Sequence, residues 1–170
     1  QLRLPGGIQI DTGGTLCIDG WLEGDIVLNG GTLQVDADTT ISSDSKISLS
    51  SSSNLKIVGG SSLTYEGEAL SLDNKTLSLF GGGSLVLKSD GSNPVTLNNA
   101  DGELRFSATS ATTTVSHVKI SSGDISNAPT LKMSSNGVIQ NLAHEEFLEI
   151  NFASGKTLSI TEAFEVPYGK

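Results

Sequence analysis

A short apolar repeat dominates this sequence: two apolar residues flank a single other residue, and the unit recurs every seven to ten residues. The repeat often follows a glycine pair, as in Gly13-Gly14-Thr15-Leu16, Gly30-Gly31-Thr32-Leu33 and Gly82-Gly83-Ser84-Leu85. Short units that recur in this way can bury their apolar side only by stacking on their neighbours. The sequence therefore predicts a stacked repeat architecture.

Each apolar unit has the alternation of a short β-strand, because successive side chains of a strand point to opposite faces. Gly, Asn, Asp and Ser separate the units, and these residues favour turns. The clearest units are Ile8/Ile10, Leu16/Ile18, Ile26/Leu28, Leu33/Val35, Ile47/Leu49, Leu55/Ile57, Leu63/Tyr65, Leu77/Leu79, Leu85/Leu87 and Val118/Ile120.

A longer period groups these strands into coils. Leu33, Leu55 and Leu77 are 22 residues apart, as are Ile41, Leu63 and Leu85. We therefore predict an all-β fold, a single-stranded parallel β-helix (β-solenoid) with about three short strands and 22 residues per coil. Equivalent strands would stack in parallel at about 4.8 Å, with each inward side chain above its counterpart.

An antiparallel β-sandwich is the alternative fold, because it also has short strands at regular intervals. Two observations favour the solenoid. Tight Asn-Gly or Asp-Gly hairpin turns rarely separate the strands, and a sandwich gives no reason for a 22-residue register.

The sequence changes character twice. The rhythm loosens over residues 107–114, and the last 26 residues carry five of the nine glutamates and three of the five phenylalanines. We expect residues 1–143 to form the solenoid and residues 144–170 to form a C-terminal cap or the start of a following module. A cap would cover the strand edges at the open end of a solenoid.

The composition of the chain limits which classes of binding partner are expected. There are 10 Lys and Arg against 19 Asp and Glu, a net charge of −9, which disfavours nucleic acid and anionic membrane surfaces. No run approaches the 18 apolar residues of a membrane span, so we expect no membrane insertion. The single cysteine, Cys17, lies between Leu16 and Ile18 and is expected to be a small buried hydrophobic residue.

The chain has few residues suited to catalysis. His117 and His144 are the two histidines, and neither lies in a nucleophile, metal or phosphate-loop motif. The glycine pairs precede strands, whereas a dinucleotide-binding loop opens a helix. We therefore expect no enzyme activity, no catalytic residues, no metal site and no cofactor.

Four residues are weak candidates for binding. Asp36 and Asp38 bracket Ala37 and could hold calcium or act on a glycosidic bond, although Asp at strand ends also makes turns. Trp21 and Tyr65 could stack on a sugar ring, although aromatic residues also pack over the corners of a coil.

At Gly-Gly-Thr-Leu-x-Val-Asp (30–36) and Gly-Gly-Gly-Ser-Leu-Val-Leu (81–87) the chain resembles the β-helical repeat regions of bacterial surface adhesins and autotransporter passengers. The resemblance covers roughly residues 6 to 140 in rhythm and composition. It implies an extracellular, cell-surface structural or adhesive segment: a rigid rod, a spacer or a self-assembling element.

The same resemblance suggests partners. These are further copies or neighbouring repeats of a longer chain, and surface glycans. Two alternatives remain open: a polysaccharide-binding or polysaccharide-cleaving β-helix, and a trimeric module of a phage tail fibre.

Overall fold

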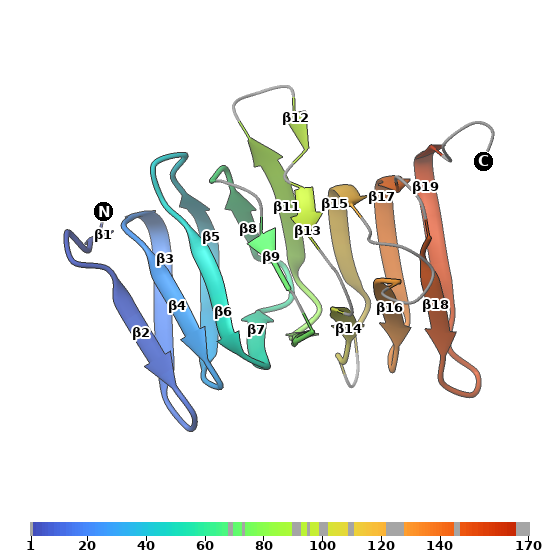
Figure 1. Ribbon diagram of the computed structural model, residues 1–170, viewed down its shortest axis with the longest axis horizontal. Helices are drawn as coiled ribbons and strands as arrows, with labels where there is room; N and C mark the ends of the chain where they lie inside the picture. Colours follow the sequence, from blue (N-terminus) through green and yellow to red (C-terminus); the bar gives the residue numbers. More distant parts are fainter. Residues whose placement is uncertain are drawn as a thin grey trace.

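The computed structural model describes residues 2–67, 70–72, 74–89, 93–94, 96–98, 102–108, 111–121, 128–144 and 147–165. In this part of the chain the structure is all β, and the strands stack side by side from the N-terminal to the C-terminal coil (Figure 1). Among the described residues we find no helical segment with the length and hydrophobicity that a membrane span requires.

Three faces run along the stack, and each coil contributes one strand to each face. The first face consists of the N-terminal parts of β3 (Thr15–Glu23) and β5 (Thr32–Ile41), followed by β7 (Ser53–Ile57), β10 (Thr76–Phe80), β14 (Glu103–Phe106), β16 (Thr130–Met133) and β18 (Glu149–Phe152).

The second face begins with β1 (Leu2–Arg3) and the C-terminal parts of β3 and β5. It continues with β8 (Ser62–Tyr65), β11 (Ser84–Ser89) and the N-terminal parts of β15 (Thr113–Ser121), β17 (Gly137–His144) and β19 (Leu158–Glu165).

The third face consists of β2 (Ile8–Asp11), β4 (Ile26–Asn29), β6 (Ile47–Ser51), β9 (Leu70–Ser71) and β13 (Thr96–Asn98), then the C-terminal parts of β15, β17 and β19. All the strand pairs within these faces are parallel. Among the described residues β6 and β9 do not pair, so the third face consists of two paired groups, β2-β4-β6 and the strands from β9 onward. An antiparallel pair is formed by β11 with the short β12 (Asn93–Pro94), outside the stack. This topology confirms the β-solenoid with three strands per coil and excludes the antiparallel sandwich.

The core is a continuous stack of aliphatic and aromatic side chains between the faces. On the first face Leu33, Leu55 and Leu79 lie in register and are buried, and Phe106 and Met133 continue the same row. Because identical inward positions lie above one another, medium-sized aliphatic residues fill the interior at every level. This packing explains why so few aromatic residues suffice.

The 22-residue spacing is correct on average, but two of the predicted neighbours are wrong. Leu33 pairs with Leu55 and Leu63 with Leu85, as predicted. Leu55, however, pairs with Leu79 rather than Leu77, because a longer corner intervenes.

That corner is residues 58–62, five residues between the paired residues Ile57 and Leu63, and it separates the first and second faces. The equivalent corner of the preceding coil has three exposed residues, 36–38, between the paired residues Val35 and Thr39. The longer corner shifts the next strand by two residues, so that Ile41 pairs with Tyr65 instead of Leu63. The number of residues in each corner therefore sets the register between successive coils. This number cannot be read from the alternation of side chains.

Residues 149–152 and 158–165 form β18 and β19, which pair in parallel with β16 and β17. The stack therefore extends through residue 165 in the described chain. Within the described residues no strand pairs with the outer edges of β18 and β19, and Phe152 and Phe164 are about half exposed there (53% and 50%).

Candidate functional site

Asp36 and Asp38 lie at the corner between the first and second faces, and their hydrogen bonds support that corner. Asp38 Oδ1 accepts hydrogen bonds from the backbone N–H and the hydroxyl of Ser62 in the next coil, at 2.8 and 2.9 Å. Asp36 Oδ1 accepts one from Gln34 Nε2 at 2.7 Å. Both carboxylates thus have intramolecular partners that account for their presence.

The two aromatic candidates lie in different environments. Trp21 is half-buried on the outer side of the second face, where its strand neighbour is Thr40. Tyr65 is buried in the core (1% exposed), and its hydroxyl accepts a hydrogen bond from the backbone N–H of Ile47 at 3.1 Å. The Tyr65 ring therefore has no surface on which a sugar could stack, and the four sequence candidates do not form one site.

The expectation that Cys17 is buried is wrong, because the structure places it on the exposed surface of the first face. Its neighbours Leu16 and Ile18 point inward, so the alternation of the strand turns Cys17 outward. The outward row that begins with Cys17 continues through Gln34, Lys56 and Phe80 on successive strands.

A polar ladder crosses the outer side of the third face. Asp11 Oδ1 accepts hydrogen bonds from Asn29 Nδ2 at 2.8 Å and from Gln9 Nε2 at 2.7 Å. These two bonds, that of Asn29 first, lower the pKa of Asp11 below its ordinary value of 3.8, because they favour the ionised form. The ladder links successive coils, and its polar side chains form hydrogen bonds with one another.

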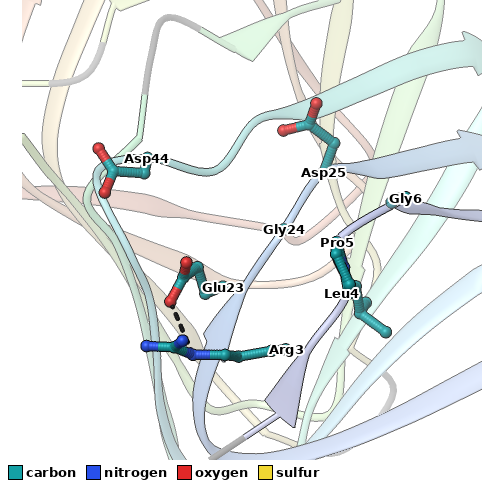
Figure 2. A pocket seen from close by; sticks show the side chains of 9 residues that line it. Arg3, Leu4, Pro5, Gly6, Glu23, Gly24, Asp25 and Asp44 are labelled. Atoms are coloured by element: carbon teal, nitrogen blue, oxygen red, sulfur yellow. Dashed lines mark ion pairs between the residues drawn. The ribbon is translucent and has the colours of Figure 1, made fainter.

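A depression of about 570 Å³ lies at the N-terminal corner between the second and third faces (Figure 2). Its acidic residues are Glu23, Asp25 and Asp44. Arg3 Nε pairs with Glu23 at 3.2 Å, and Asp25 accepts the backbone N–H of Lys46 at 3.0 Å. Within the described ranges no three potential metal ligands gather in a binding arrangement. Two of the three acidic side chains, Glu23 and Asp25, are therefore bound by groups of the same chain.

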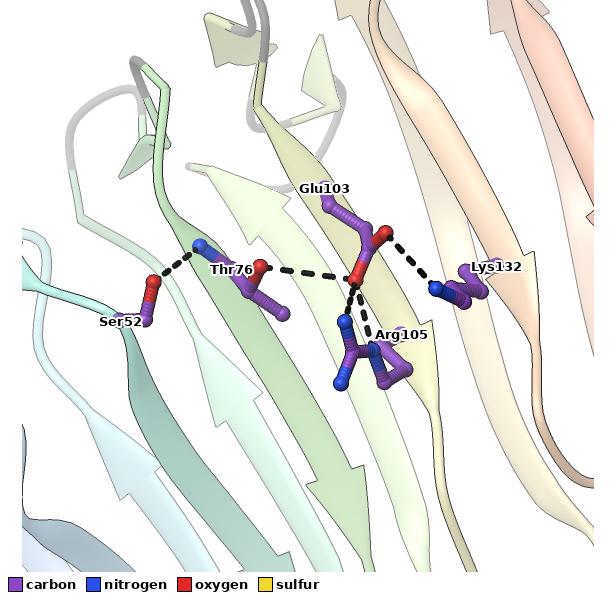
Figure 3. Close-up of polar contacts among 5 residues, drawn as sticks. All are labelled: Ser52, Thr76, Glu103, Arg105 and Lys132. Carbon is purple, nitrogen blue, oxygen red and sulfur yellow. Dashed lines mark hydrogen bonds and ion pairs between the residues drawn. The ribbon is translucent and has the colours of Figure 1, made fainter.

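The outer side of the first face carries a polar network in its C-terminal half (Figure 3). Glu103 accepts a hydrogen bond from Arg105 Nε at 2.6 Å and pairs with Lys132 at 3.8 Å. The hydroxyl of Thr76 donates a hydrogen bond to the same Glu103 carboxylate at 3.5 Å. The backbone N–H of Thr76 donates to the hydroxyl of Ser52 at 2.9 Å. The network therefore spans the three neighbouring strands β10, β14 and β16 and the residue before β7, and it holds two cations on this face.

A second depression, of about 330 Å³, lies next to this network around Phe80. Phe80 is the last residue of β10, is half-buried on the outer side, and pairs with Lys56 of β7. Asn54 and Thr32 complete the wall, with Asn54 Nδ2 donating to Thr32 Oγ1 at 3.3 Å. Gly81, the residue after Phe80, completes the lining.

The Phe80 depression was not predicted from the sequence, although a signal was present. In Leu77-Ser78-Leu79-Phe80 the apolar pair Leu77/Leu79 fixes the inward phase, so Phe80 falls in the outward phase, where most side chains are polar. Comparison with known proteins found no match: no family model, curated protein or solved structure matches the chain. The function must therefore be inferred from the fold and its surface.

Proposed function

We propose that this chain is a structural and adhesive β-solenoid segment of an extracellular surface, in which a rigid stack spaces or presents binding elements. The observation that carries the proposal is the continuity of the stack. Parallel pairing links seven strands on the first face without interruption, and buried side chains fill the interior at every level. A fold whose strand-pairing hydrogen bonds run along one axis resists bending and suits a spacer.

The acids that could otherwise serve catalysis support this role. Asp38 and Asp36 accept hydrogen bonds that join a corner to its neighbours, and Asp11 does the same on the third face. The extracellular location is proposed from the resemblance to surface adhesins. Specific cleavage of a polysaccharide that Asp36→Asn abolishes, measured as release of reducing ends, would overturn the proposal in favour of an enzyme.

The C-terminal coil supports end-to-end association with a second copy. Phe152 is 53% exposed, and the neighbouring Ile150 and Ile160 are half-buried in the same terminal level. An edge strand with free hydrogen-bonding groups and apolar neighbours is a template for another strand. The N-terminal coil offers a complementary edge, because no described strand covers the outer side of β3 on the first face.

We expect the full chain to self-associate reversibly with rising concentration, and Phe152→Ser to raise the dissociation constant by about tenfold or more, because it removes a large apolar contact. Sedimentation velocity over a wide concentration range measures this. Asn151→Ser, on the same strand but facing outward, is the matched control and should associate like the wild type.

Two results would count against end-to-end association. A wild-type chain that stays monomeric at the highest concentrations would remove it from the proposal. A trimer that is equally stable in the wild type and in Phe152→Ser would instead favour the trimeric fibre module.

A further inference from the structure

We propose that the Phe80 depression binds an acidic polysaccharide, with Phe80 stacking on a sugar ring and Lys56 pairing with a carboxylate or sulfate group. This inference rests on the adhesive function proposed above and names its ligand. Its two central residues lie side by side on the outer surface of the first face, where neither contributes to the buried core.

Phe80 is the first element of the site. The outer side of a solenoid strand is normally polar, and the residues around Phe80 follow this rule. A partly exposed phenyl ring in this position offers an apolar surface on which a sugar ring can pack. The C–H groups on a sugar face are apolar enough to pack on such a ring, and aromatic contacts add stability beyond the area they bury.

Lys56 is the second element. It lies opposite Phe80 on the neighbouring strand, at a strand separation of about 4.8 Å. Within the described residues its ammonium group forms no ion pair, although acids outnumber cations in the chain by 19 to 10. An unpaired lysine beside a partly exposed ring is suited to an anionic group on a ligand that the ring also contacts.

The polar residues of the depression complete the recognition of a sugar. The bond from Asn54 Nδ2 to Thr32 Oγ1 leaves the amide oxygen of Asn54 as an acceptor for a sugar hydroxyl. Gly81 contributes backbone atoms to the lining of the depression. An apolar surface beside a few placed polar groups is the usual composition of a small-molecule site.

The arrangement along the first face favours a polymer over a single sugar. Arg105 and Lys132 lie on the two strands after β10, also on the outer side. From β7 to β16 this surface carries three cations, Lys56, Arg105 and Lys132, against the one carboxylate of Glu103. A linear acidic chain that follows the solenoid axis would therefore pass from the depression onto further cations.

Isothermal titration calorimetry of the full chain tests the inference with three probes: oligogalacturonate as the carboxylated ligand, a heparin oligosaccharide as the sulfated ligand, and a neutral dextran oligosaccharide. We expect at least one acidic probe to bind and dextran not to bind. Phe80→Ala and Lys56→Gln should each weaken binding by about tenfold, equivalent to about 1.4 kcal/mol. Raising the salt concentration should also weaken it.

Lys156→Gln is the matched control, because Lys156 is an exposed lysine in the turn before β19, away from the depression. It should leave the affinity unchanged, and thermal melting should show that all variants are folded. Three results would overturn the inference: no binding of either acidic probe, equal binding of dextran, or unchanged affinity in folded Phe80→Ala and Lys56→Gln. These results would leave the spacer role intact, because that role is tested by the chain's mass in solution and by the absence of turnover.

Discussion

Leu55→Asp should leave the chain unfolded or only partly folded at room temperature. Leu55 is 4% exposed and lies between Leu33 and Leu79 in the central row of the first face. A carboxylate in this position has no polar partner, and burying it costs more than about 4 kcal/mol on top of the lost apolar contacts. Domains of this size are stable by only about 5–15 kcal/mol. Circular dichroism during urea and thermal unfolding measures the loss.

Lys56→Asp provides the comparison for this experiment. Lys56 neighbours Leu55 on the same strand but is exposed on the outer side. The same aspartate there should change the melting temperature little, because its charge stays in water. Equal stability of the two variants would show that the inward face of β7 has been assigned incorrectly.

Gly81→Ala should also be strongly destabilising, for two separate reasons. Gly81 has a φ of +89°, which a residue with a Cβ adopts at a cost of about 1–2 kcal/mol. In addition, a Cβ at this position would lie 2.1 Å from the carbonyl oxygen of Ile57, in the coil below. Since backbone rather than a flexible side chain blocks the space, the two coils must move apart locally, and we expect a total cost above about 3 kcal/mol.

Gly60→Ala separates the two contributions. Gly60 has nearly the same φ, +90°, but no heavy atom lies within 4 Å of the position of its added Cβ. It should cost only the conformational part, about 1–2 kcal/mol. Urea unfolding of both variants gives the difference, and equal losses would mean that the close contact between Gly81 and Ile57 is absent in solution.

The strands and their inward faces were predictable because alternation is a local property. Leu63 and Tyr65, for example, form an apolar pair of the same kind as Leu85 and Leu87, and all four are buried. The same rule turns Tyr65 inward and Cys17 outward, although their residue types suggest the opposite. Phe80 is a further example, because its residue type favours the core but its phase in the strand turns it outward.

The register between coils was less predictable. It depends on how many residues turn each corner, and corners tolerate insertions because their backbone lies at the surface. Residues 58–62 make a corner two residues longer than residues 36–38, so Leu55 pairs with Leu79 although Leu77 has the more regular spacing. The 22-residue period is an average over corners of different lengths. It therefore cannot show at which coil the register shifts by two residues.

Engineered disulfides test the central claim, the parallel stacking of coils in this particular register, most directly. In a Cys17→Ser background, Asn54→Cys combined with Ser78→Cys places two cysteines of the outward phase on paired positions of β7 and β10. Paired strands are about 4.8 Å apart, within the range that a disulfide spans. We expect rapid, near-complete oxidation of this pair, measured by mass spectrometry, and slow oxidation when Thr76→Cys replaces Ser78→Cys. Preferential cross-linking of positions 54 and 76 would show that the coils follow the uniform 22-residue register, and would contradict the stacking described above.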